Sequence, residues 1–162
     1  MKSNMLARGA ILAALYVCLT HLQNLILPGS TSWAIQFRVS EALCVLAFFT
    51  PAAIPGLTLG CFLYNISFVG ALPLDMVLGT AATAIATAGM YYTRNMKLCK
   101  LPLLGLMLPA IANGLLVGWE LSLYIGGSFW LNALYVALGE LGVLFTLGIL
   151  LYWVLQKRRL LR

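Results

Sequence analysis

The stretch that organises this chain reads Gln36-Phe37-Arg38-Val39-Ser40-Glu41-Ala42-Leu43 and runs on to Pro51-Ala52-Ala53-Ile54-Pro55-Gly56. It sets a cation and an anion, Arg38 and Glu41, three residues apart at the head of an apolar run. Two prolines and a glycine then interrupt the chain before a second apolar run. Charged residues make up only 9% of the chain, so this pair requires an explanation.

The composition indicates a membrane protein. Hydrophobic residues make up 62% of the 162 residues, and the mean hydropathy is +0.98. A soluble domain of this length could not cover such a core with so few polar side chains. We therefore predict an all-α membrane protein that folds as one domain over residues 1–162, a compact bundle of transmembrane helices.

Six apolar runs predict six transmembrane helices, because a membrane helix needs about 20 apolar residues. They cover approximately residues 7–27, 37–50, 54–70, 72–93, 101–125 and 129–156. The first run is too long for the apolar core of a signal peptide, so we expect it to remain as an uncleaved span. The second is short for a span.

The basic residues predict the orientation of the bundle. With six spans, nine of the ten Lys and Arg residues fall on one side, namely Lys2, Arg8, Arg94, Lys97, Lys100, Lys157, Arg158, Arg159 and Arg162. Basic residues concentrate on the cytoplasmic side of membrane proteins, so we expect both termini to be cytoplasmic. The net charge of +6 then reflects topology and does not imply a nucleic-acid partner.

Charged residues inside membrane segments are costly, so they usually pair or line a cavity. Arg38 and Glu41 are spaced to meet on one helix face. They form either an internal pair that braces the loop above it or a pair that also borders a ligand cavity. Asp75 lies near the outer start of the fourth span, where the helix dipole favours a carboxylate. It is a candidate binding residue as well.

Two further acids lie within the last two spans. Glu120 shares one helix face with Asn113 and Tyr124, and Glu140 lies about two turns below Asn132. Polar groups on one stripe of an apolar helix indicate an inward face that lines a pocket, although a neighbouring helix could also satisfy each of them. We predict a ligand or coupling role for Glu120 and Glu140.

Aromatic residues gather at the predicted outer side, around the first and third outer loops. The group comprises Trp33, Phe37, Trp119, Tyr124, Phe129 and Trp130. An interfacial aromatic belt is one explanation. Aromatic faces beside carboxylates also suit a flat, nitrogen-rich ligand, which would stack on the rings and donate two N–H bonds to one carboxylate.

Catalysis and metal binding are not expected. His21 is the only histidine, and the chain has neither a His-Glu-x-x-His nor a Gly-x-Ser-x-Gly motif. The four cysteines lack the close paired spacing of a metal site. A membrane enzyme and a purely structural membrane subunit remain the alternatives to a binding protein.

A small six-span chain with Ala10-x-x-x-Ala14 in its first span resembles the substrate-binding S component of an energy-coupling factor (ECF) transporter. More narrowly, the opening stretch resembles the QueT family, together with Phe48-Phe49-Thr50-Pro51, Gly60-Cys61, Asn65, Asp75 and Gly79-Thr80. Gln-Phe-Arg-x-Ser-Glu is the specific part of this resemblance, and Ala-x-x-x-Ala is weak outside that context.

The resemblance implies uptake of a queuosine precursor or salvage product, a 7-deazaguanine compound, across the bacterial plasma membrane. It implies as partners a coupling subunit (EcfT), docked at Ala10 and Ala14, and two ATPases that use ATP, with no cofactor in this chain. The ligand would lie near the outer face, by the fourth to sixth spans and the outer loops, with Asn65 nearby. A different vitamin-like substrate is the alternative.

Overall fold

The computed structural model describes residues 2–31, 35–98 and 100–158. The helical elements are α1 (Lys2–Ile26), the 3₁₀ helix η1 (Val39–Phe48), α2 (Ala53–Ser67), α3 (Asp75–Thr93), α4 (Leu103–Tyr124), α5 (Phe129–Val143), the π-helical turn η2 (Leu144–Gly148) and α6 (Ile149–Arg158). Within the described residues there is no β-strand, only an isolated bridge between Leu98 and Leu101.

The predicted all-helical architecture is confirmed. Each of the six apolar runs coincides with a helical segment, the sixth being the continuous run α5–η2–α6. Among the described residues, three helices are long and apolar enough to cross a membrane: Ser3–Ile26, Leu103–Tyr124 and Phe129–Lys157. η1 and α2 are apolar but shorter.

The second segment differs from expectation because η1 is a 3₁₀ helix and not an α-helix. A 3₁₀ helix rises about 2.0 Å per residue, compared with 1.5 Å in an α-helix, and rarely runs beyond three or four residues. At that rise the 10 residues of η1 cover about 20 Å. The tighter coil therefore carries a short segment as far as a longer α-helix would.

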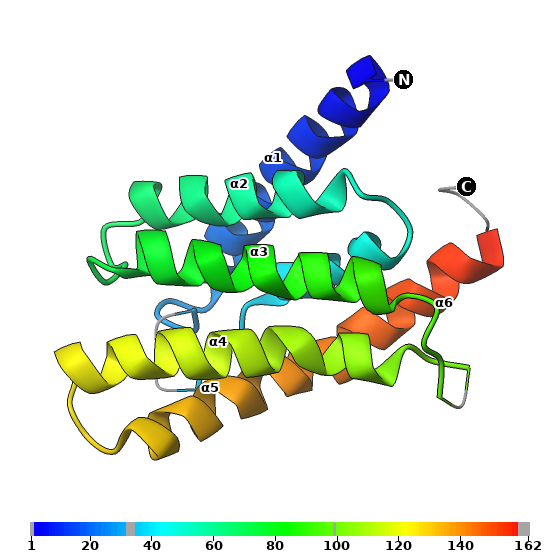
Figure 1. The fold of residues 1–162 in the computed structure, drawn as a ribbon. Helices are drawn as coiled ribbons and strands as arrows, with labels where there is room; N and C mark the ends of the chain where they lie inside the picture. Colours follow the sequence, from blue (N-terminus) through cyan, green and yellow to red (C-terminus); the bar gives the residue numbers. More distant parts are fainter. Residues whose placement is uncertain (1, 32–34, 99, 159–162) are drawn as a thin grey trace.

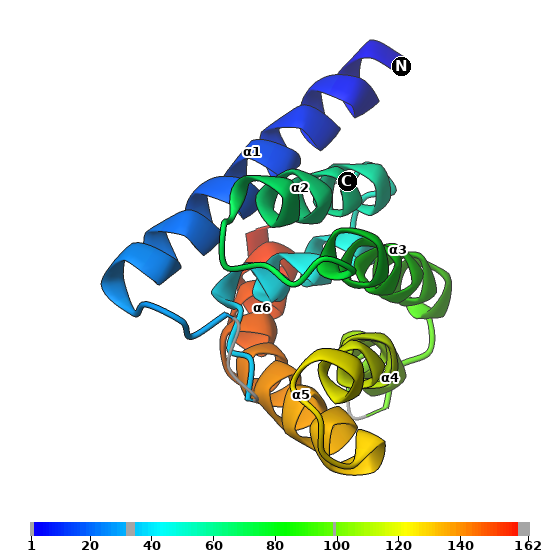
Figure 2. The ribbon, with the colours of Figure 1, turned by 90° about the vertical axis from the view of Figure 1, so that its left-hand side faces the viewer.

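η1 lies at the centre of the bundle. Every residue from Ser40 to Phe48 is buried, and η1 contacts all six α-helices and η2. The main core cluster is built on it, with side chains from α1, α2, α3, α4, η2 and α6. Figure 2 views the bundle end-on and shows the α-helices arranged around this central segment. The opening stretch of the sequence is therefore the axis around which the other helices pack.

Small residues allow α1 and α2 to pack closely. A Cβ added to Gly56 would lie 2.6 Å from the Gly9 carbonyl oxygen, and one added to Gly60 would lie 2.9 Å from that of Ala13. Such approaches are possible only without a side chain, as expected where membrane helices pack through small residues. The N-terminal part of α1 extends beyond the other helices (Figure 1).

The helical segments alternate in direction along the bundle. Figure 1 shows the N-terminus, the C-terminal end of α6 and the α3–α4 connection at one end. The α2–α3 and α4–α5 connections lie at the opposite end. The start of α1 and the end of α6 therefore lie at the same end of the bundle, as an even number of helical segments requires. The cytoplasmic location of both termini stays a prediction from the basic residues.

Candidate functional site

Arg38 and Asp75 form a buried ion pair at the end of the bundle that carries the α2–α3 connection. Arg38 Nη2 donates to Asp75 Oδ2 at 2.8 Å, and the two side chains are only 4% and 9% exposed. Arg38 Nε also donates to the Thr31 carbonyl oxygen at 3.3 Å, and the guanidinium lies 5.9 Å from the centre of the Tyr64 ring. The cation is thus held from three sides.

The predicted pairing of Arg38 with Glu41 is wrong. Arg38 caps the start of η1 with an extended backbone (φ −104°, ψ 101°), so its side chain leaves the helix surface that carries Glu41. Glu41 accepts hydrogen bonds from the Tyr16 hydroxyl and from Cys44 Sγ, the latter at 3.1 Å. The i, i+3 rule applies to residues inside one helix, and Arg38 lies just outside it.

A pocket opens next to this ion pair. It encloses about 290 Å³ of empty space, including some open solvent. Its walls come from the α1–η1 connection, from α2 and α3 with their connection, and from α4. The lining residues are Thr31, Gln36, Arg38, Tyr64, Phe68, Gly70, Ala71, Leu72, Asp75, Val117 and Glu120.

Glu120 is the lining residue whose two carboxylate oxygens both lack a partner among the described residues. The residue is 0% exposed. The backbone N–H groups of Leu74 and Asp75 lie nearby at the start of α3, but neither completes a hydrogen bond to Glu120. A buried carboxylate without a partner is costly, so this site lacks a donor.

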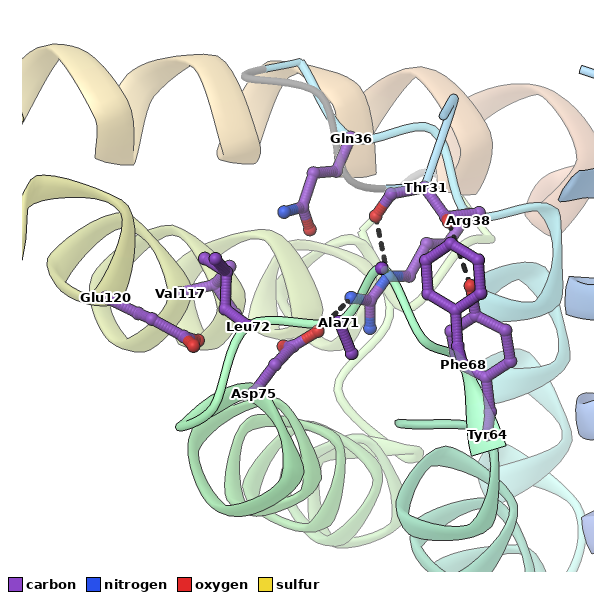
Figure 3. A pocket seen from close by; sticks show the side chains of 11 residues that line it. Thr31, Gln36, Arg38, Tyr64, Phe68, Ala71, Leu72, Asp75, Val117 and Glu120 are labelled. Carbon is purple, nitrogen blue, oxygen red and sulfur yellow. Dashed lines mark hydrogen bonds and ion pairs between the residues drawn. The ribbon is translucent and has the colours of Figure 1, made fainter. Parts of the chain in front are cut away.

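Asp75 and Gln36 add polar atoms to the same space. Asp75 Oδ1 is buried and unpaired, and no described residue hydrogen-bonds the side-chain amide of Gln36. Figure 3 shows the Glu120 and Asp75 carboxylates and the Gln36 amide pointing toward one space. The pocket therefore presents acceptors from two carboxylates, together with one amide that can both donate and accept.

One wall of the pocket is aromatic. The Tyr64 and Phe68 rings stack with their centres 5.4 Å apart and an interplanar angle of 15°. The Tyr64 hydroxyl accepts a hydrogen bond from Asn24 and lies 3.0 Å from Thr31 Oγ1. Neither Tyr64 nor Phe68 was predicted from the sequence, although their i, i+4 spacing places both on one face at the end of α2 that leads to α3.

Asn65 supports the pocket indirectly. Its Nδ2 donates to the backbone carbonyl of Asp75 at 2.7 Å and fixes the start of α3 against α2. Asn65 does not belong to the lining. Asn65 was predicted to lie near a ligand. In the structure it contacts Asp75, which lines the pocket.

Glu140 and Asn113 meet inside the bundle. Asn113 Nδ2 donates to Glu140 Oε1 at 3.1 Å, and Glu140 Oε2 has no partner among the described residues. Both side chains are buried, but neither lines the pocket. The structure separates the two acids that the sequence analysis grouped together, since only Glu120 faces the pocket.

The predicted aromatic and polar outer residues lie elsewhere. Trp119 and Tyr124 are each 47% exposed, and Phe37 is exposed to the same extent. Asn132 Nδ2 donates to the Gly126 carbonyl at 3.0 Å and thereby caps the α4–α5 connection. None of these residues lines the pocket, and Trp33 lies outside the described residues. Exposed rings at the bundle end fit the aromatic-belt alternative.

The predicted docking residues lie on the free side of α1. Ala10 and Ala14 are exposed, whereas Gly9 and Ala13 face α2. As for metals, the described residues contain no group of three His, Cys, Asp or Glu side chains that could hold an ion.

The comparison with protein families covers almost all of the described chain. The profile of the family described as QueT transporter matches residues 6–157. The chain belongs to the QueT transporter family. The match includes η1 and all the pocket residues, so the resemblance of the Gln36–Leu43 stretch to this family is confirmed.

A related protein carries the same family name. The chain is 40% identical over 76 residues to a protein of Lactococcus lactis subsp. cremoris (strain MG1363) named "Queuosine precursor transporter QueT". This alignment covers 47% of the present chain and 43% of that QueT protein. The chain therefore matches less than half the length of this relative. No solved structure matches the chain.

Proposed function

We propose that this chain is the substrate-binding S component of an ECF-type importer that takes up a queuosine precursor, a 7-deazaguanine compound. Membership of the QueT family and the name of the Lactococcus relative support the transport role. The observation that carries the site is the buried Glu120 carboxylate, which lacks a donor and faces a pocket.

The chemistry of the ligand complements the pocket. The guanine-like edge of a 7-deazaguanine carries a ring N–H beside an exocyclic amine, two donors that one carboxylate can accept together. We assign this edge to Glu120. The Gln36 amide can donate to the lactam carbonyl, and Phe68 with Tyr64 offers a flat face for stacking.

The charge of the pocket is also consistent with this ligand class. Arg38 balances the charge of Asp75, while Asp75 Oδ1 remains free to accept a hydrogen bond. A cationic aminomethyl substituent on the ligand could use this second carboxylate.

The partners follow from the same proposal. The exposed Ala10–Ala14 side of α1 would dock the coupling subunit (EcfT), and two ATPase subunits would hydrolyse ATP, in the bacterial cell membrane. This chain would then need no cofactor of its own. Its part is to bind the ligand at the outer face and to release it when the complex is energised.

Titration calorimetry on the purified protein tests the site. We expect 7-deazaguanine to bind and 7-deazaadenine, which lacks the lactam N–H, to bind about 10- to 100-fold more weakly, since a hydrogen bond to a charged group contributes about 1.5–3 kcal/mol. Glu120→Gln should weaken 7-deazaguanine binding to a similar extent, with Gln156→Ala at the far end of the bundle as control. Loss of binding in Glu140→Gln alone would move the recognised edge to Glu140.

Thermal unfolding separates a binding defect from a folding defect. Glu120→Leu removes an unpaired buried carboxylate, so the ligand-free variant should unfold at or above the wild-type temperature. A ligand at 100 times its Kd stabilises the wild type by about 2.7 kcal/mol. A purely structural subunit would show no such ligand-dependent shift.

A further inference from the structure

Gln23, on the last turns of α1, holds the backbone on both sides of Arg38. It is buried, with 8% of its surface exposed. Its Nε2 donates to the Phe37 carbonyl oxygen, and its Oε1 accepts from the Val39 N–H at 2.8 Å. These two groups belong to the peptide units immediately before and after the Arg38 Cα. The side-chain amide therefore bridges the two peptides that define the Arg38 backbone angles.

Gln23 makes a third hydrogen bond that ties this bridge to the preceding connection. Nε2 donates to Ser30 Oγ at 2.9 Å, so both donor hydrogens of the amide are used. The Ser30 carbonyl in turn accepts from the Phe37 N–H at 3.0 Å. The segment that carries Gln36 and Arg38 is thus held by two hydrogen bonds from Gln23 and by one between Phe37 and Ser30.

The opposite side of the segment rests on α5. A Cβ added to Gly139 would collide with the Gln36 carbonyl oxygen and would lie 3.0 Å from the Gln36 carbonyl carbon and 3.2 Å from its nitrogen. Backbone therefore packs directly on backbone at this point. The segment lies between Gln23 on one side and Gly139 on the other, with little freedom to shift.

We propose that Gln23 is a positioning residue for ligand recognition, acting through Arg38. It does not line the pocket, yet it fixes the extended backbone from which the Arg38 side chain reaches Asp75. The proposal rests on the proposed function of this pocket, since Arg38 and Asp75 matter for recognition only if the ligand binds beside them.

Hydrogen exchange of the ligand-free protein tests the structural part. Gln23→Met keeps the side-chain length and removes all three hydrogen bonds. The Val39 amide, whose acceptor is Gln23, should then exchange about tenfold faster or more, whereas amides in α5 should not change. Gln156→Met, an exposed Gln on α6, is the matched control. Unchanged exchange at Val39 in Gln23→Met would overturn the proposal.

A double-mutant cycle with Arg38→Lys tests the functional part by calorimetry with 7-deazaguanine. Gln23→Met should weaken binding about tenfold in the wild-type background and by less than about twofold beside Arg38→Lys, because its effect passes through Arg38. A residue with only a general structural role would give equal losses in both backgrounds, and that result would overturn the proposal.

The two proposals fail in different ways. If Glu120→Gln and Gln23→Met both bind 7-deazaguanine as the wild type does, the pocket assignment is wrong. If Glu120→Gln loses binding while Gln23→Met retains it, the pocket assignment stands and Gln23 is not a positioning residue. Should Arg38→Lys bind too weakly to titrate, the loss of 7-deazaguanine binding in Gln23→Met compared with Gln156→Met, together with the exchange at Val39 and in α5, decides: wild-type affinity in Gln23→Met overturns the proposal.

Discussion

Arg38 and Asp75, 37 positions apart in the chain, form a buried ion pair in which Nη2 donates to Oδ2 at 2.8 Å. The pair joins the start of the central segment η1 to the first turn of α3. It pairs Arg38 with one of the two carboxylates that line the pocket, the other being Glu120. The position of η1 relative to α3 at the site is therefore tied to a contact between residues far apart in the chain, which no local sequence pattern predicts.

Breaking one half of the Arg38–Asp75 pair should be strongly destabilising. Arg38→Met or Asp75→Leu leaves an uncompensated charge in the interior, which costs about 3–5 kcal/mol. The double variant Arg38→Met/Asp75→Leu removes both charges and should be closer to wild type than either single variant. Thermal unfolding in detergent measures this. Destabilisation of the double variant equal to the sum of the two singles would show that the pair does not act as a unit.

Two facing glycines should respond differently to alanine. A Cβ on Gly56 would lie 2.6 Å from the Gly9 carbonyl oxygen, so Gly56→Ala must push α1 and α2 apart, at a cost of about 1–3 kcal/mol. A Cβ on Gly9 would have its nearest neighbour, the Ala52 carbonyl oxygen, at 3.5 Å, an ordinary contact. Gly9→Ala is therefore the matched control.

The control variant should be neutral or slightly stabilising, because alanine is favoured over glycine in a helix by up to about 1 kcal/mol. Unfolding temperatures of the two variants in the same detergent test the contrast. If Gly56→Ala were as stable as Gly9→Ala, the close packing of α1 on α2 would be refuted.

Cysteine labelling of intact cells should establish the orientation of the bundle. In a variant without the native cysteines, a cysteine at Ser128 in the α4–α5 connection should react with a membrane-impermeant maleimide. One at Asn95, in the α3–α4 connection, should react only after permeabilisation. Both positions are exposed and lie at opposite ends of the bundle. Labelling of Asn95→Cys in intact cells would reverse the orientation predicted from the basic residues.

Helix number could be predicted from sequence because apolar length is a local property. The runs ending near Ile26, Ser67 and Tyr124 have boundaries that the structure changes by only a few residues. Glu120 and Asp75 were found for a related reason, since acids inside apolar runs require a partner or a cavity. Both line the pocket.

The helix type and the partners of the polar residues could not be predicted in this way. The 3₁₀ helix η1 begins at Val39, one residue after Arg38. Arg38 therefore keeps an extended backbone, and its side chain does not share a helix face with Glu41. Which acid faces the pocket depends on how α4 and α5 are rotated against their neighbours. Glu140 meets Asn113 inside the bundle because of that rotation, while Glu120 meets the pocket.

The sequence by itself determined the class of protein, the six helical segments and the family, because hydropathy and a contiguous motif are readable without contacts. Only the tertiary structure decided that Arg38 pairs with Asp75, that Tyr64 and Phe68 form the aromatic wall, and that Gln23 holds the backbone on both sides of Arg38. These contacts join segments far apart in the chain, and their geometry follows from helix packing, which no local pattern encodes.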